Sequence, residues 1–199
     1  MSSELRYFVL HKPFGILSQF TPEGGHQSLA DLDFTFPKDV YPVGRLDQDS
    51  EGLLILTNDN YLKNNLLDPK SEKLKTYLVQ VEGEINDEAL RGLEEGVSVK
   101  HKGKVYHTRP AEASHFSGII PEERDPPVRF RKSVPTSWLT LTIIEGKNRQ
   151  VRKMTAAVGF PTLRLIRLGI QNLKLNELAI GEVQEVLKTD IYQQCGIKP

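Results

Sequence analysis

The sequence is poor in cysteine and has no long apolar run. Its 199 residues contain one cysteine, Cys195, which excludes a disulfide within the chain and fits a reducing compartment. No apolar stretch approaches the roughly 20 residues of a transmembrane helix. The start, MSSELRYFVLHKP, lacks the basic and apolar regions of a secretory signal. These absences predict a cytoplasmic protein with no membrane partner.

Several catalytic signatures are also missing. The chain has no G-x-S-x-G elbow, no phosphate-binding G-x-x-x-x-G-K-[ST] loop and no G-x-G-x-x-G turn. Its five histidines show no HExxH or other zinc-ligand spacing. The sequence therefore gives no support for an α/β-hydrolase, a P-loop nucleotidase, a dinucleotide-dependent enzyme or a zinc enzyme.

Net charge is absent too, because 26 basic residues balance 26 acidic ones. The charges are nevertheless separated along the chain. Residues 82–95 hold six acids and one base, whereas residues 145–167 hold six bases and one acid. Such separation either builds one basic face on a neutral protein or reflects ordinary solvated helix surface.

Apolar alternation predicts strands joined by helices. Strands are expected at 5–10, 53–57, 75–83, 137–146 and 163–170. Helices are expected after an N-cap at Asn58 or Asp59, after Asn86 with an end at Gly96, and after Asn148 with an end at Gly159. On the last helix Arg149 and Arg152 are three residues apart, so they can point the same way. The pattern is that of an α/β protein of the α+β type.

Residues 110–137 form a long connection with five prolines. The stretch also carries Arg124, Arg129, Arg131 and Lys132. A connection of this length in a compact domain is either a functional loop or a mobile surface insertion.

Three acids stand close together at Asp47, Asp49 and Glu51, before Gly52. The spacing is like the start of an EF-hand, but position 12 would be Asn58 instead of a bidentate Glu, which disfavours calcium. A pair of carboxylates could also cleave a glycosidic bond, although one short acidic loop does not establish that chemistry. From the residues alone, the loop keeps these alternatives open.

Taken whole, GRLDQDSEGLLILTND resembles the signature of RNA pseudouridine synthases of the RsuA type, a group that modifies bacterial ribosomal RNA. Three further motifs match in order: HKPFGILSQF, with His where Asn is usual, KTYLVQVEG, and EGKNRQVRKMTAAVGFPTLRLIRLGI. The segment RDPPVRFRKSVPTSWL is similar to a branch that acts on large-subunit (23S) ribosomal RNA. The resemblance covers nearly the whole chain.

The resemblance implies a pseudouridine synthase fold, with a bent, mainly antiparallel mixed sheet, flanking helices and a central active-site cleft. It implies one catalytic domain over 1–199, built as two lobes that share one sheet, without an S4 RNA-binding domain. Asp47 is then the catalytic carboxylate, Arg152 its partner base, and Tyr77 the active-site tyrosine. Moving uracil from N1 to C5 needs neither redox nor phosphate chemistry, so no cofactor and no metal are expected.

The expected partner is ribosomal RNA, bound by a monomer. Candidate RNA contacts are basic residues of the motifs and of the long connection, namely Arg45, Lys147, Arg149, Lys153, Arg129 and Arg131, with Arg164 and Arg167 as weaker candidates. Two other functions stay open. One is a non-catalytic RNA-binding or ribosome-assembly protein that retains the fold, and the other is a glycosidase acting on a nucleoside.

Overall fold

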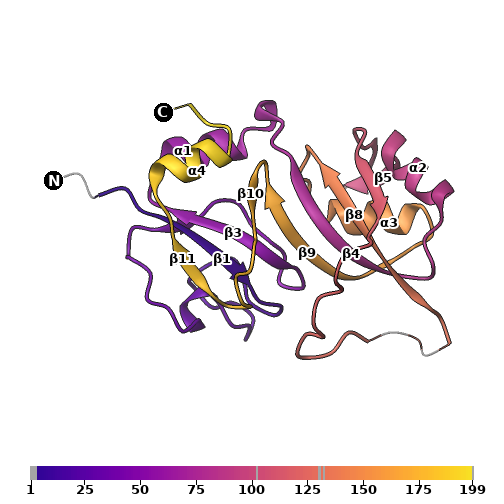
Figure 1. The fold of residues 1–199 in the computed structure, drawn as a ribbon, viewed down its shortest axis with the longest axis horizontal. Helices are drawn as coiled ribbons and strands as arrows, with labels where there is room; N and C mark the ends of the chain where they lie inside the picture. Colours follow the sequence, from indigo (N-terminus) through magenta and orange to yellow (C-terminus); the bar gives the residue numbers. More distant parts are fainter. Residues whose placement is uncertain (1–3, 102, 130, 132, 199) are drawn as a thin grey trace. The chain divides into compact units, whose positions relative to one another are not determined.

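A computed structural model describes residues 4–101, 103–129, 131 and 133–198 (Figure 1). The chain divides into two compact units, of which unit 1 comprises Met1–Lys73 with Arg167–Pro199 and unit 2 comprises Leu74–Ile166. Strand β9 (Thr162–Ile170) crosses the boundary between these ranges. Each unit therefore uses part of this strand.

Unit 1 is built around strand β3 (Glu51–Thr57), all seven residues of which are buried. Its strands follow the order β11-β1-β3-β9, and its helices α1 and α4 contact each other through Tyr61 and Tyr192. The other elements are β1 (Tyr7–Lys12), β2 (Tyr41–Pro42), β10 (Leu173–Lys174), β11 (Val183–Glu185), α1 (Asn60–Leu67), α4 (Lys188–Gln194) and two 3-10 turns (Leu29–Asp31, Pro69–Ser71).

The core of unit 1 is apolar on one face of β1 and β3. Phe8 and Leu10 of β1 lie with Leu54 and Leu56 of β3, as the antiparallel register of the two strands dictates. Phe34 packs edge-on against Phe8, with ring centroids 5.7 Å apart. Burial of this cluster fixes β3, and thereby the chain that precedes it.

Unit 2 has the strand order β9-β4-β8-β7, with helices packed on one face. Its elements are β4 (Lys75–Glu82), β5 (Ser98–His101), β6 (Lys104–His107), β7 (Glu112–His115), β8 (Thr136–Ile143), α2 (Asp87–Glu95) and α3 (Gln150–Ala157). Strands β5 and β6 form a separate antiparallel hairpin. The predicted class, a mixed α/β fold with a mainly antiparallel sheet, is confirmed.

Most of the expected element ends are confirmed. Asp59 caps α1 by accepting hydrogen bonds from the N–H groups of Tyr61 and Leu62, and Asn86 caps α2, which ends at Gly96.

The expectation that Asn148 caps α3 is wrong. The helix begins at Gln150, and its N-cap residue is Arg149, which has a φ of 52° and makes no side-chain cap. The carboxamide of Gln150 instead accepts a hydrogen bond from the N–H of Lys147.

Candidate active site

The loop that carries Asp47 is held by the segment that follows β1. The Ser18 hydroxyl donates to the carbonyl of Leu46 at 2.9 Å and accepts from the N–H of Leu46 at 3.1 Å. The N–H of Gly15 donates to the carbonyl of Gln48 at 2.9 Å. These bonds fix the backbone on both sides of Asp47, which leaves its half-buried carboxylate at a defined place in unit 1.

A buried lysine lies beneath the same loop. Lys12 has no exposed surface, and its ammonium donates to the carbonyl of Pro13 at 2.7 Å and toward that of Gln48 at 3.5 Å. Burial lowers the pKa of this ammonium to about 7, against the attraction of the carboxylates of Glu51, Asp49 and Asp47. When protonated, Lys12 therefore attracts all three of these carboxylates.

The acids that accompany Asp47 take different positions. Asp49 is half-buried, whereas Glu51 is buried at the start of β3. Gln48 is hydrogen-bonded at 2.7 Å to Nδ1 of His26, which belongs to the polar turn at 21–27. Arg45, a candidate RNA contact, is exposed just before the loop.

Close backbone packing explains the glycine of the signature. Gly52 has a φ of +104°, and a Cβ at this position would clash with the backbone of Arg167. The Arg167 side chain is 5% exposed and donates to the carbonyl of Leu53 at 2.8 Å. Arg164 is buried as well. The suggestion that these two arginines contact phosphate is therefore wrong, because both guanidinium groups are enclosed and bound to backbone carbonyls.

In unit 2, Tyr77 lies on β4 opposite Leu141 of β8. The side chain is 8% exposed and belongs to the core cluster that includes Val79, Val151 and Met154. Packing against α3 therefore holds the ring of Tyr77 at the edge of this core.

Arg152 is half-buried on α3. The residues before and after Arg152 lie on different sides of the helix. Val151 is buried, whereas the Lys153 ammonium donates to the carbonyl of Asn148 at 2.9 Å. Apolar burial of Val151 and Met154 sets the rotation of α3, and that rotation decides where Arg152 projects.

The basic loop before α3 is organised by Glu145. Its carboxylate accepts hydrogen bonds from the N–H of Arg109 at 3.0 Å, the Lys147 ammonium at 3.1 Å and the Gln150 carboxamide at 2.7 Å. Although burial alone would raise it, these bonds hold the pKa of Glu145 below its ordinary value. The sequence did not single out Glu145 or Lys12, because each is an ordinary charged residue until its burial is known.

The remaining candidate RNA contacts lie in exposed segments of the chain. The Lys147 ammonium stands 3.6 Å from the ring centre of Tyr106, and Arg149 is exposed. In the long connection Arg129 is exposed, whereas Arg131 forms an ion pair with Glu82 at 3.2 Å. Lys132, which belongs to the same basic stretch, lies outside the described residues.

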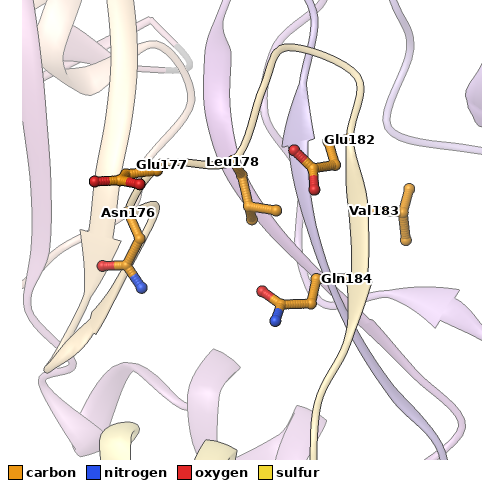
Figure 2. Close-up of a pocket in the computed structure, with 6 residues that line it drawn as sticks. All are labelled: Asn176, Glu177, Leu178, Glu182, Val183 and Gln184. Atoms are coloured by element: carbon orange, nitrogen blue, oxygen red, sulfur yellow. The ribbon is translucent and has the colours of Figure 1, made fainter.

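An open depression in unit 1 lies between β10 and β11 (Figure 2). Glu177 and Glu182 stand on either side of Leu178 in this view, and Nδ1 of His11 is 2.8 Å from the carbonyl of Leu178. The lining residues are Asn176, Glu177, Leu178, Glu182, Val183 and Gln184. Two carboxylates and no basic group make this depression unsuited to RNA phosphates.

Other kinds of site find no support in the described part of the chain. Residues 4–101, 103–129, 131 and 133–198 contain no group of three or more His, Cys, Asp or Glu side chains placed to hold a metal ion. Within the same residues no helix has the length and apolar character needed to cross a bilayer. Cys195 is buried, and burial raises the pKa of its thiol to about 12, which keeps it unreactive at neutral pH.

Comparison with known proteins assigns the family. The model of the RNA pseudouridylate synthase family matches residues 6–157, so the chain belongs to that family. The protein is accordingly an RNA pseudouridine synthase, an isomerase that converts uridine to pseudouridine within RNA.

Two relatives and one solved structure are similar to this chain over most of its length. "Ribosomal large subunit pseudouridine synthase E" of Vibrio vulnificus is 48% identical over 92% of this chain and 76% of its own. The protein of the same name in Xanthomonas axonopodis pv. citri is 49% identical over 86% and 88%. A crystal structure of a pseudouridylate synthase superposes with a TM-score of 0.77 at 27% identity, covering 96% of this chain and 74% of the other.

Proposed function

We propose that the protein isomerises a uridine of large-subunit (23S) ribosomal RNA to pseudouridine. The observation that carries this proposal is the near 50% identity, over most of both chains, to two relatives named for the large ribosomal subunit. The protein then works in the cytoplasm as a monomer, with residues 1–199 acting as one catalytic domain. No metal or cofactor takes part, because the reaction breaks and forms bonds without a change in oxidation state.

Asp47 is the proposed catalytic carboxylate. The C1′–N1 bond breaks with its electron pair on N1, the uracil turns, and a C5–C1′ bond forms. The proton on C5 leaves to solvent, and N1 takes up a proton. A carboxylate serves this sequence either as a nucleophile toward C1′ or as a base toward the 2′ proton, and both roles need it ionised. The fixed backbone at Leu46 and Gln48 supports the proposal, because a carboxylate on a mobile loop would have to be oriented at each turnover.

Arg152 and Tyr77 are the proposed partners of Asp47. A guanidinium beside a carboxylate favours its ionised form and fixes its orientation through charge-assisted hydrogen bonds. The Tyr77 ring is proposed to stack on the uracil and its hydroxyl to relay the C5 proton. Both residues project from elements whose positions are set by core packing in unit 2, which supports a precise placement.

RNA binding is proposed to use the basic side chains that the structure leaves at or near the surface. Lys147, Arg149 and Lys153 surround the start of α3, and Arg45 precedes the Asp47 loop. Arg129 is proposed as a stronger contact than Arg131, since Arg131 is already paired with Glu82.

Tritium release tests the activity directly. 23S ribosomal RNA labelled at C5 of uridine, from a strain that lacks the enzyme, should release tritium with the intact protein, because the C5 proton leaves during isomerisation. Absence of release would contradict the proposed substrate. RNA binding without release would instead favour the non-catalytic assembly role, and free uracil among the products would favour a glycosidase.

The role of Asp47 is tested with the same assay. Asp47→Asn should lower the rate by roughly a thousandfold or more, while thermal unfolding stays within a few degrees of the unmodified protein. If Arg152 acts through Asp47, Asp47→Asn combined with Arg152→Met should be no slower than Asp47→Asn alone. Tritium release that persists in Asp47→Asn would remove this residue from the mechanism and leave the function standing.

A further inference from the structure

Residues 116–122, here called the strap, connect two strands of unit 2 that are not neighbours. At one end, the N–H of Phe116 donates to the carbonyl of Trp138 on β8 at 3.0 Å. At the other, Nη1 of Arg164 on β9 donates to the carbonyl of Glu122 at 2.6 Å. Strand β4 lies between β8 and β9 in the sheet order, so the strap passes across β4.

The Glu122 end of the strap lies on the sheet face away from the helices of unit 2. Leu165 and Leu139 belong to the core cluster shared with α2 and α3. Neighbouring side chains of a strand point to opposite faces, so Arg164 and Trp138 point away from that cluster. Since the Arg164 side chain holds the carbonyl of Glu122, the strap reaches this second face at its Glu122 end.

The middle of the strap exposes two large apolar side chains. Ile119 is 95% exposed and Ile120 is 61% exposed, and Ile119 has the highest value among the large apolar side chains of the described residues. The anchor at the strap's end, in contrast, is an arginine that is only 3% exposed. The structure thus uses a buried guanidinium to fix a loop whose isoleucines contact mainly solvent.

Two arginines follow the strap further along the chain. Arg124 donates to the carbonyl of Pro126 at 2.7 Å, and Arg129 is exposed further along the same connection. An apolar pair beside arginines has the chemistry of a base-stacking element flanked by phosphate contacts. The acids Glu122, Glu123 and Asp125 oppose a purely electrostatic attraction, so an RNA contact here depends on the isoleucines.

We propose that Ile119 and Ile120 form an apolar wedge that packs against unstacked bases of the RNA substrate, with Arg129 on a neighbouring phosphate. The proposal rests on the proposed function, since a uridine in folded RNA must leave its stack before it can react. Side chains such as isoleucine enter opened base steps and keep them apart. Anchoring at Trp138 and Arg164 keeps the wedge presented before RNA arrives.

Serine substitutions test the wedge. Ile119→Ser combined with Ile120→Ser should lower kcat/KM for tritium release from 23S ribosomal RNA about tenfold, because base–apolar contact is lost. The slope of log affinity against log salt should stay unchanged, since no phosphate contact is removed. Arg129→Ala should instead make this salt slope smaller, because it removes a phosphate contact.

Matched variants separate the wedge from general effects. Ile180→Ser removes a half-exposed isoleucine of unit 1 and should leave kcat/KM unchanged. Ile119→Leu combined with Ile120→Met keeps the apolar character and should retain activity. A serine variant within twofold of the unmodified protein would overturn the wedge, while its tritium release would leave the proposed function intact.

A crosslink tests where the wedge binds. p-Benzoylphenylalanine in place of Ile119 should crosslink to 23S ribosomal RNA on irradiation, and the reverse-transcription stop should lie within a few nucleotides of the pseudouridine. A stop that is absent, or no stronger than with the same substitution at Ile180, would contradict the proposal. Failure of the unmodified protein to release tritium would instead contradict the proposed function.

Discussion

Lys12 is buried behind an acidic loop, and this burial changes its ionisation. Lys12 is enclosed at the end of β1. Two backbone carbonyls accept hydrogen bonds from its ammonium, and three carboxylates attract its charge. Burial outweighs this attraction, which lowers its pKa to about 7. The charge that faces Asp47 is therefore sensitive to pH near neutrality, and so is the stability of the fold around it.

The pKa of Lys12 predicts a pH-dependent stability. Its folded pKa of about 7 lies below the ordinary value for lysine, so between these values the unfolded chain binds more protons and stability rises with pH. Relative to Lys12→Met, the unmodified protein should gain on the order of 1 kcal/mol per pH unit between pH 7.5 and 9.5. Urea unfolding midpoints of both proteins across this range measure the difference.

The comparison with methionine removes contributions from all other titrating groups, because both proteins share them. Below about pH 6 the two curves should run parallel, since Lys12 is then protonated in both the folded and the unfolded chain. Parallel curves above pH 7.5 as well would show that the folded pKa of Lys12 is not lowered.

At the scale of elements, one carboxylate ties together three parts of unit 1. Asp59 caps α1, and its Oδ2 accepts hydrogen bonds from Tyr7 of β1 at 2.8 Å and from Tyr192 of α4 at 2.5 Å. The three side chains are buried. Although burial alone would raise it, the tyrosine hydroxyls and the backbone N–H groups of the cap hold the pKa of Asp59 below its ordinary value.

Two substitutions separate the helix cap from the tyrosine contacts. Asp59→Asn keeps a capping oxygen but loses the charge, and should lower the free energy of unfolding by about 1–2 kcal/mol. Asp59→Ala loses both and should lower it by about 3 kcal/mol or more. Urea unfolding at pH 7 gives both values, and equal losses would show that the capping oxygen contributes nothing beyond the charged contacts to the tyrosines.

The pH limits of this cluster follow from its shifts. The lowered pKa of Asp59 gives stability that is lost as pH falls below about 4, where the unfolded carboxyl gains its proton. Burial, followed by the Asp59 contact, raises the pKa of Tyr192 to about 12. The unfolded tyrosine ionises near pH 10, so stability from this group falls above that pH.

At the scale of the whole molecule, a neutral protein has to bind a polyanion. Not all of the basic residues at 145–167 are exposed, because Arg164 and Arg167 are buried. The acids of α2, among them Glu94 and Glu95, are exposed and repel RNA at long range. Local groups and short-range contacts therefore have to supply most of the affinity.

Removal of these acids should raise RNA affinity only when salt is low. Glu94→Gln combined with Glu95→Gln should increase the affinity for 23S ribosomal RNA by about two- to threefold at 20 mM salt, and by little at 0.15 M, where the Debye length is about 8 Å. Filter binding across salt concentrations measures this. Aspartates at both positions keep the charge and should behave like the unmodified protein, and a gain that persists at 0.15 M would indicate direct contact instead of long-range repulsion.

Sequence pattern determined the fold class and most elements, because burial of one face imposes a period on the residues. Residues 53–56 of β3 are all apolar since the strand is enclosed on both faces, and Asp59 and Asn86 stand where caps are needed. Asn148 is not the cap, because the helix begins after Arg149 and the carboxamide of Gln150 accepts from the N–H of Lys147. A local pattern does not encode such competition between neighbouring side chains.

Asp47 is proposed as the catalytic carboxylate because the signature around it resembles a known family, whose model matches the chain. The roles of Lys12, Glu145 and Arg164 appeared only in the tertiary structure. Sequence rules place such charged residues at the surface, but Lys12 and Arg164 are buried, and Glu145 and Arg164 bond to residues far away in the chain. Burial depends on what folds over a residue, so the sequence specified the chemical groups, and packing decided which of them became anchors.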